Sequence, residues 1–504
     1  MRKKMVFRLA AALVFISASF HLNAQLAFSG QLRTRTELRD GYGTLESVGS
    51  QPAFLTSQRT RLTFNFHSGH VTLQASVQDL RVWGADASTI SNADGSRLGV
   101  HEAWAELVLS DARDSSFKRP AFEYLSLKIG RQELVYDDQR LLGNLDWLQQ
   151  ARRHDAVVLK WRNKGWQADL GAAYSQNTDA FNYNGTYYTP ANLPPYIKDS
   201  KGNLVPTPSG LVPLANASGI SARSGSPLLA NAPSTNGMNQ NYKSMQFLYV
   251  ARKVHRMNLS ALLFADEFGK YTLDSVRSVV GADTGYIYGR RFASSGVNAR
   301  VTAGLLLAGP LNKQNDLRFT AGAWYQGGKN KDGLDLSAFM STISLSYVMG
   351  NFTCTTGWDY LSGNDGFSSS PSDHRFDPLY GTPHKFWGIM DYFYAGTGSS
   401  AGGLSNPFVK IKVAAPDGRM SLGLDYHYFA MAAAQKDQKG LPLNKYLGSE
   451  LDLVGNYALN KNATLELGLC GLAASGSMEY AKGIAPGTAR LAAHWAYLQV
   501  NVKI

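Results

Sequence analysis

The feature that most constrains the fold is an alternation of polar and apolar residues at every second position. In the segment 29–40, SGQLRTRTELRD, Arg33, Arg35 and Glu37 alternate with leucines and threonines. Successive side chains of a β-strand point to opposite faces. The segment therefore predicts a strand with one charged face and one apolar or hydroxyl-bearing face.

The same pattern returns in further stretches and continues to the last residue. These stretches lie at residues 57–66, 70–78, 101–109, 123–130, 316–328 and 496–504. Hydrophobic residues make up 44% of the chain, yet the mean hydropathy is only −0.22, because they are dispersed rather than gathered in blocks. Past the N-terminal region no run of about 18 apolar residues occurs, which excludes helical spans but not barrel strands of about 10 residues.

The N-terminus has the form of a secretory signal peptide. Four basic residues within positions 2–8 precede an apolar run at 9–20, and Ala24 then offers a small residue for cleavage. The run is shorter than the ~20 residues that a spanning helix requires. We expect residues 1–24 to be removed on export and residues 25–504 to form one domain.

A strand with two unlike faces fits either a soluble β-sandwich or a membrane barrel whose charged face lines a wet lumen. The connections favour the barrel. Short turns such as HSGH, RNKG, VMGN and LNKN alternate with long polar loops near 177–241, 267–296, 362–384 and 432–446. Tight periplasmic turns and long extracellular loops are typical of bacterial outer-membrane barrels, so the pattern predicts an all-β, antiparallel up-and-down barrel of roughly 16 to 20 strands.

Aromatic residues near the expected strand ends support the membrane interpretation. Amphipathic rings favour the depth of the lipid headgroups. The residues concerned are Tyr174, Tyr249, Trp358, Tyr360, Tyr426, Tyr428 and Tyr457. The barrel must close, because an unpaired strand edge in hydrocarbon leaves backbone groups without partners.

The formal net charge is +12, which suits an anionic partner. A nucleic acid is not the expected partner of an exported protein. Arginine binds carboxylates in a bidentate manner and keeps its charge, so a row of arginines in a lumen concentrates anions and repels cations. The residues predicted as lumen cations from their alternate positions are Arg33, Arg35, Arg59, Arg61, Lys128 and Arg318.

Acidic residues are expected to pair with these cations across strands and to prevent a polyanion from binding too tightly. They are Glu37, Glu102, Glu106, Asp146 and Asp359. The alternative reading is that the charged rows form a solvated ladder that only stabilises the wall.

Signatures of catalysis or metal binding do not occur in the sequence, which has no HExxH, GxSxG or P-loop motif. His154 and Asp155 are neighbours in an expected strand and point to opposite sides, so they do not form a relay. His384 and Lys385 are expected to end a long loop that re-enters the wall. Cys354 lies in a different strand-like stretch from the second cysteine, Cys470, and we expect neither a disulfide nor a metal site, no cofactor and no enzyme.

Several longer motifs make the chain similar to the alginate export family of Gram-negative outer-membrane barrels. They are LSLKIGRQELVYDDQRLLGNLDWLQQARRHDAV at 125–157, AWYQGGK at 323–329, GWDYLSGNDG at 357–366, FDPLYGTPHKFWGIMDYFY at 376–394 and LGSELDLV at 447–454. The resemblance implies a monomeric barrel of about 18 strands, an even number as in its class. It also implies a lumen that passes a polyuronate outward and a periplasmic export partner. The family's lumenal arginines match Arg131 and Arg140, although Arg131 is in phase with the apolar Ile129 and so requires a bulge or a position near the rim.

We therefore expect an outer-membrane channel that passes anionic solutes, with an alginate-like polyuronate as cargo and outer-membrane lipid around it. A general porin for small anions or oligosaccharides is the main alternative. An outer-membrane lipid-modifying enzyme and a soluble extracellular glycan-binding β protein are the alternatives from other classes.

Overall fold

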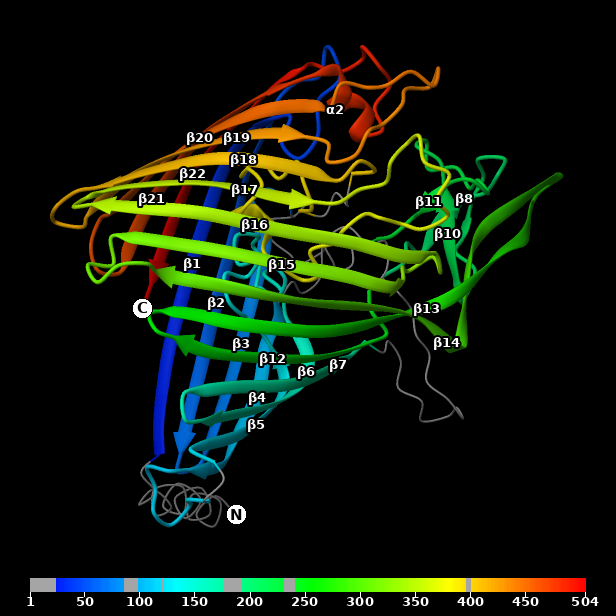
Figure 1. Ribbon diagram of the computed structural model, residues 1–504. Helices are drawn as coiled ribbons and strands as arrows, with labels where there is room; N and C mark the ends of the chain where they lie inside the picture. The colour runs from blue at the N-terminus through cyan, green and yellow to red at the C-terminus, as the bar shows by residue number, and fades with distance from the viewer. Residues whose placement is uncertain (1–23, 86–97, 120–121, 176–191, 231–240, 396–399) are drawn as a thin grey trace, which may run out of the picture.

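The wall of the molecule is a single closed sheet. The computed structural model describes residues 24–85, 98–119, 122–175, 192–230, 241–395 and 400–504. Within these residues, eighteen strands form the wall (Figure 1). They are β1 (Ala24–Asp40), β2 (Ala53–Ser68), β3 (Val71–Val82), β4 (Leu98–Asp111), β5 (Tyr124–Gln132), β6 (His154–Asn163), β7 (Trp166–Tyr174), β12 (Ser244–Val254), β13 (Met257–Val280), β14 (Asp283–Pro310), β15 (Leu317–Lys329), β16 (Asp335–Met349), β17 (Phe352–Leu361), β18 (Leu404–Ala414), β19 (Met420–Ala430), β20 (Tyr446–Ala458), β21 (Ala463–Ala474) and β22 (Ala492–Lys503).

Each wall strand pairs antiparallel with its neighbours along the chain, and β7 pairs with β12 across the long connection between them. The last strand returns to the first, because Gln31 of β1 pairs with Lys503 of β22 and Asp40 pairs with His494. Closure supplies every wall strand with partners on both edges, which a hydrocarbon environment requires. The predicted fold class and strand number are confirmed.

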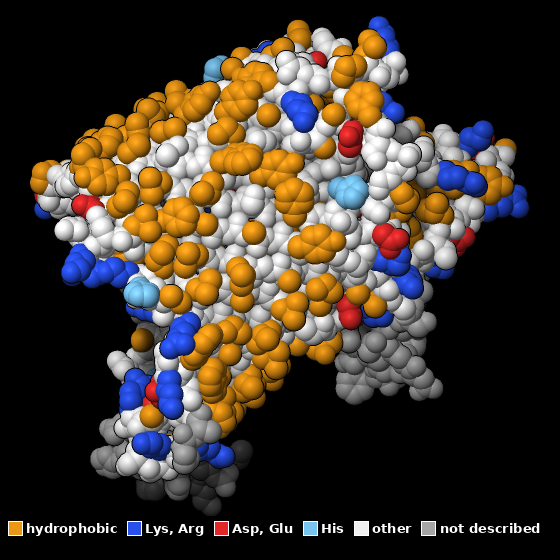
Figure 2. Space-filling view, in the orientation of Figure 1, with side chains coloured by type: hydrophobic (Ala, Val, Ile, Leu, Met, Phe, Trp, Pro, Cys, Tyr) orange, Lys and Arg blue, Asp and Glu red, His pale blue; other side chains and the backbone are white. Residues whose placement is uncertain are grey.

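The two faces of the wall differ as the alternation predicts. On β2 the outward Leu62 and Phe64 are 38% and 43% exposed, whereas the inward Arg59 is 1% exposed. Figure 2 shows apolar side chains spread over the visible face of the barrel. Trp358, Tyr426, Tyr428 and Tyr457 are exposed, as expected for rings at the membrane boundary. The expectation for Tyr249 is wrong, because its side chain points inward and is buried.

Short connections gather at one end of the barrel, at residues 69–70, 164–165, 255–256 and 350–351. This is the end expected to face the periplasm. Among the described residues no helix is long and apolar enough to cross a membrane. Residues 1–23 lie outside the described part, so the signal peptide and its cleavage after Ala24 remain predictions.

The predicted loop at 267–296 is wrong. β13 and β14 stay paired through this region, from Asn258 opposite Ala308 to Val280 opposite Asp283, with one irregularity between Gly269 and Tyr271. The ribbon continues past the barrel and was missed because its polar composition resembles that of a loop. Residues 177–191 and 231–240 of the predicted loop at 177–241 lie outside the described part.

Residues 196–228 form a small lobe on this ribbon (Figure 1). It contains β8 (Tyr196–Lys198), β9 (Leu204–Pro206), β10 (Leu211–Ala215) and β11 (Ser226–Pro227), and β10 pairs with β14. Ile197, Val205, Leu211 and Ile287 form its own apolar core. The lobe lies at the end of the barrel opposite the short turns.

Two connecting segments, 133–153 and 362–395, fold into the barrel rather than away from it. They meet where Leu142 bridges to Tyr380, and both residues are buried. Apolar side chains from both segments, among them Leu141, Phe376 and Trp387, join the main buried core with inward residues of the wall. The connection is therefore longer than the predicted loop 362–384, and the expectation that His384 and Lys385 re-enter the wall is wrong.

Two short helices lie in the connections between wall strands. Pro383–Lys385 is a 3-10 helix (η1) within the second inward segment. The wall resumes only at Leu404. The connection at 431–445 agrees with the predicted loop near 432–446, and the helix α2 (Gly476–Ala481) lies in the connection between β21 and β22.

Candidate functional site

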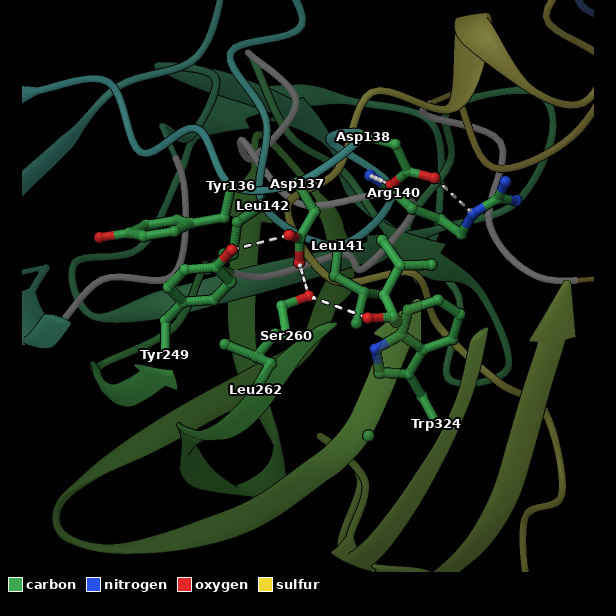
Figure 3. A pocket seen from close by; sticks show the side chains of 12 residues that line it. Tyr136, Asp137, Asp138, Arg140, Leu141, Leu142, Tyr249, Ser260, Leu262 and Trp324 are labelled. Atoms are coloured by element: carbon green, nitrogen blue, oxygen red, sulfur yellow. Dashed lines mark hydrogen bonds and ion pairs between the residues drawn. The ribbon is translucent and has the colours of Figure 1, made fainter. Parts of the chain in front are cut away.

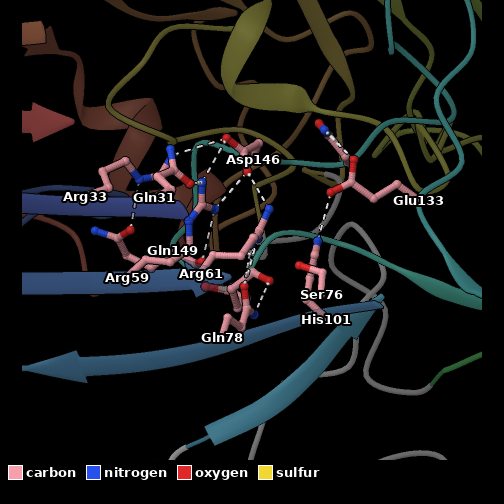
Figure 4. A network of polar contacts seen from close by, with 12 residues as sticks. Gln31, Arg33, Arg59, Arg61, Ser76, Gln78, His101, Glu133, Asp146 and Gln149 are labelled. Carbon is pink, nitrogen blue, oxygen red and sulfur yellow. Dashed lines mark hydrogen bonds and ion pairs between the residues drawn. The ribbon is translucent and has the colours of Figure 1, made fainter. Parts of the chain in front are cut away.

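Three arginines of the inner wall converge on one carboxylate of the first inward segment. Arg33 of β1 and Arg59 and Arg61 of β2 approach Asp146 at 3.2, 2.8 and 3.7 Å (Figure 4). The register of β1 and β2 explains the cluster, because Arg33 lies opposite Arg59 and Gln31 lies opposite Arg61. Alternate positions on adjacent strands thus bring the guanidinium groups to one inner face.

Amide side chains complete the arginine cluster. Arg33 Nε donates to Gln149 at 3.0 Å, Arg59 donates to Gln31 at 2.7 Å and Arg61 donates to Gln78 at 2.8 Å. Burial opposes ionisation of Asp146, but the hydrogen bond from Arg59 and the charges of the three arginines outweigh it. They hold the pKa of Asp146 below its usual value. Asp146 therefore attaches the first inward segment to the wall through an ionised carboxylate.

Backbone carbonyls extend this attachment. Arg33 donates to Leu148 O at 3.2 Å, and Arg35 donates to Trp147 O at 3.0 Å. The Arg35 guanidinium lies over the Trp147 ring at 4.2 Å. Glu37 pairs with Arg35 at 3.0 Å and Arg39 at 2.8 Å on its own strand, rather than across strands. The arginines of β1 and β2 thus hold the inward segment.

Arg140 connects the inward segment to another part of the wall. It pairs with Asp359 of β17 at 2.9 Å and with Asp138 at 3.3 Å. Its guanidinium lies 4.0 Å from the Phe386 ring of the second inward segment. Arg140 is buried and lies on a segment between strands rather than on a strand. Its ion pair with Asp359 links the first inward segment to β17, and its contact with the Phe386 ring joins the second inward segment to the first.

The charged residues of β4 and β5 have other partners than arginine. Glu106 pairs with Lys160 at 3.1 Å, and Glu102 accepts from Gln74 at 2.6 Å. The Lys128 ammonium lies 3.8 Å from the Trp104 ring centre. Of the five acids expected to pair with the predicted cations across strands, Asp146 and Asp359 pair with predicted arginines from distant parts of the chain. Glu37 pairs with Arg35 within its own strand, and Glu102 and Glu106 form no ion pair with a predicted cation among the described residues.

Arg131 does not lie in the lumen. It pairs with Asp155 at 2.8 Å, and both side chains are exposed on the outer face, next to the exposed Ile129. No register shift occurs between β5 and β6, so its parity with Ile129 decides its direction. Arg318 is in phase with the inward Trp324 and Gln326, near the short-turn end of β15, and is exposed there.

A second buried charge cluster was not predicted from the sequence. Arg300 of β14 donates to Asp266 of β13 at 2.9 Å, and Tyr380 of the second inward segment donates to the same carboxylate at 2.9 Å. Asp377 lies 3.7 Å from Arg300, and burial raises the pKa of Asp377 to about 6 even though Arg300 acts in the opposite sense. Asn298, Arg300 and Thr302 alternate with the apolar Ala299 and Val301 in the sequence, a signal that could have indicated the inward direction of Arg300.

Among the described residues, His101, Glu102 and Glu133 form the one group with the ligand spacing of a metal site. A bulge opposite Ser76 and Val77 makes His101 the extra residue and turns it to the side of Glu102. His101 Nε2 contacts Glu133 at 2.9 Å, and the other Glu133 oxygen accepts from Asn144 at 2.8 Å. Protein donors therefore already satisfy the Glu133 carboxylate without a metal ion.

A closed barrel with an apolar exterior, a charged inner wall and inward-folded connections is an outer-membrane channel of the porin class. Residues 24–182, which include β1 to β7 and the first inward segment, match the family model described as alginate export. This match agrees, over residues 24–182, with the resemblance that the sequence motifs indicated. The motifs from 323 onward lie beyond the matched range.

Solved structures of outer-membrane proteins share the fold. OpdO of Pseudomonas aeruginosa has a TM-score of 0.53 at 10% identity, with 95% of this chain and 97% of that chain covered. OccAB4 of Acinetobacter baumannii has a TM-score of 0.53 at 11% identity, with 96% and 99% covered. OpdK of P. aeruginosa, solved with vanillate, has a TM-score of 0.52 at 11% identity, with 95% and 98% covered. A search of curated protein sequences found no match.

Proposed function

We propose that this outer-membrane channel conducts carboxylated solutes, and that its cargo is a polyuronate chain moving outward. The observation that carries the proposal is the convergence of Arg33, Arg59 and Arg61 on the single carboxylate of Asp146. Three positive charges against one negative charge leave an excess of 3 − 1 = 2 positive charges at this point. A solute carboxylate meets the same guanidinium groups that now bind Asp146.

The geometry favours transient rather than tight binding. The arginine donors are already shared with Asp146, Gln149 and backbone carbonyls, so a passing carboxylate exchanges with protein acceptors instead of filling an empty site. Conduction requires binding that is favourable enough to enter and weak enough to leave. A polyanion with a carboxylate on each sugar would repeat this exchange along its length.

Small carboxylates are the second candidate cargo. The inward segments 133–153 and 362–395 fill part of the lumen, which favours solutes smaller than a polymer. OpdK, which shares the fold, was solved with vanillate, a small aromatic carboxylate. Comparing block of the current by oligouronates with conduction of small carboxylates separates the two candidates.

The proposal includes export with signal-peptide cleavage after Ala24 and function as a monomer, for which closure of the wall by one chain is a necessary condition. A periplasmic partner would deliver the polymer to the end with the short turns. N-terminal sequencing of the mature protein and its mass in detergent test the first two points.

The test of the function is ion selectivity. Purified protein in planar bilayers under a KCl gradient should show an anion-favouring reversal potential. Arg59→Gln combined with Arg61→Gln should move the reversal potential toward zero, because it removes two lumen charges while keeping amide donors. Arg131→Gln is the matched control, since it removes a charge from the outer face. A reversal potential unchanged by the Arg59/Arg61 pair would refute the lumen assignment.

A further inference from the structure

A polar cavity of about 430 Å³ lies between the inner wall and residues 133–137. Its wall side is made by β5, β6, β7 and β12, and the lining includes Lys128, Lys160, Arg162, Asp169 and Tyr249. β6 and β7 are joined by the short turn at 164–165, so the Arg162 end of the cavity faces the periplasmic side. Its size falls in the range of about 300–1,000 Å³ that small-molecule sites have.

The carboxylates that line the cavity have no spare oxygens. Asp137 accepts from Tyr249 at 2.7 Å and from Ser260 at 2.9 Å (Figure 3). Asp169 accepts from Arg162 at 2.6 Å on one oxygen and from Tyr136 at 3.2 Å on the other. The oxygens of Glu133 are bound by His101 and Asn144. None of these acids is therefore free to bind a cation.

The cations of the cavity, in contrast, keep unused donors. Lys128 makes no ion pair and no hydrogen bond with any residue that the structure describes, and its ammonium is held over the Trp104 ring at 3.8 Å. Arg162 uses Nη1 for Trp161 O and Asp169, which leaves Nε and Nη2 without a described partner. Spare positive donors beside fully bound acceptors match a ligand that is itself anionic and rich in acceptors.

We propose that this cavity is a subsite that binds the carboxylate of an acidic sugar residue on the periplasmic side, ahead of the Arg33, Arg59 and Arg61 cluster. Lys128 binds the carboxylate, and Arg162, which lies opposite Tyr124 and so four positions from Lys128 along β5, donates to another sugar residue of the same chain. This inference rests on the proposed function and adds a specific place of entry to it. A chain captured here has its next carboxylates directed toward the arginine cluster.

The test uses the full mature chain in planar bilayers with a defined oligouronate added from the periplasmic side. Lys128→Met keeps an unbranched side chain of similar length beside Trp104 and removes the charge. Losing one charge-assisted contact should weaken the oligouronate block about tenfold. Lys412→Met is the matched control, because Lys412 is an exposed lysine in the inward phase of β18 without a described side-chain contact. It should leave the block unchanged.

Two further variants keep the test decisive. Lys128→Arg should retain the block within about twofold. Lys128→Gln replaces Lys128→Met if the latter yields no channels, and it should show the same loss. A neutral oligosaccharide of equal length should block wild-type and Lys128→Met channels to the same extent.

The outcomes separate this inference from the proposed function. If the oligouronate blocks the wild-type channel and neither Lys128→Met nor Lys128→Gln weakens the block, the subsite is refuted while the proposed function stands. If Lys128→Met and Lys412→Met weaken the block equally, general electrostatics explains it and the subsite is refuted. If the wild-type channel shows neither block by the oligouronate nor anion selectivity, the proposed function itself fails.

Discussion

The attachment of residues 144–150 to the wall should depend on one carboxylate, and Asp146→Asn tests this. The substitution keeps the shape of the side chain but removes the charge that pairs with Arg33, Arg59 and Arg61. Removing one partner of a fully buried ion pair costs about 3–5 kcal/mol, whereas an exposed pair contributes about 0–1 kcal/mol. Arg59 is 1% exposed and Asp146 41%, so an intermediate loss of about 2 kcal/mol is expected.

A loss of about 2 kcal/mol raises the population of the detached segment roughly 30-fold. Single-channel recording should show this as a more frequent high-conductance state, together with stronger anion selectivity because the arginines lose their counter-charge. Hydrogen exchange at residues 144–150 should accelerate. Asp155→Asn is the control, since it removes a carboxylate from the outer face. Unchanged conductance states and unchanged exchange in Asp146→Asn would refute the reasoning.

Three further outcomes are expected. Burial raises the pKa of Asp377 to about 6, so the protonated carboxyl stabilises the second inward segment fully below about pH 4, and this stabilisation is lost as the pH rises through 6. Hydrogen exchange at 373–394 should therefore accelerate from pH 4 to 6 more than in Asp377→Asn, which has no carboxyl to titrate. Arg300→Met should lower the free energy of unfolding by about 3–5 kcal/mol in urea titrations, because the buried Asp266 loses its counter-charge. Arg291→Met, which breaks an exposed ion pair with Asp274, should change the free energy of unfolding by under about 1 kcal/mol. Gly130→Ala should reduce the yield of folded barrel on semi-native gels, because φ at this residue is +122° and a Cβ would lie 2.3 Å from Ala103 O. Gly99→Ala is the control and should assemble normally, because open space surrounds Gly99.

The wall could be predicted from the sequence because its physical rule is local. A period of two fixes which side chains point inward once the exterior is apolar, and this rule placed Arg33, Arg35, Arg59 and Arg61 on the inner face. The same parity rule, applied strictly, would have placed Arg131 outside with Ile129. The resemblance to the family overrode it, and the structure agrees with the parity.

The inward segments could not be predicted because their positions depend on contacts between distant parts of the chain. Asp146 is separated by more than 80 residues from each arginine that binds it, and Asp359 is still farther from Arg140. Polar composition predicts a loop but does not tell whether the loop projects outward or folds inward. The ribbon at 267–296 shows the converse error, because a two-stranded ribbon outside the membrane needs no apolar face.

The central claim is a wall that is apolar outside and wet inside, and cysteine accessibility in intact outer membranes tests it most directly. In a background of Cys354→Ser and Cys470→Ala, single cysteines replace the outward Leu62 and Phe64 or the inward Arg318 and Lys412. A membrane-impermeant maleimide should label the two inward positions and leave the two outward ones unmodified. Labelling of positions 62 and 64 with protection of 318 and 412 would contradict the account.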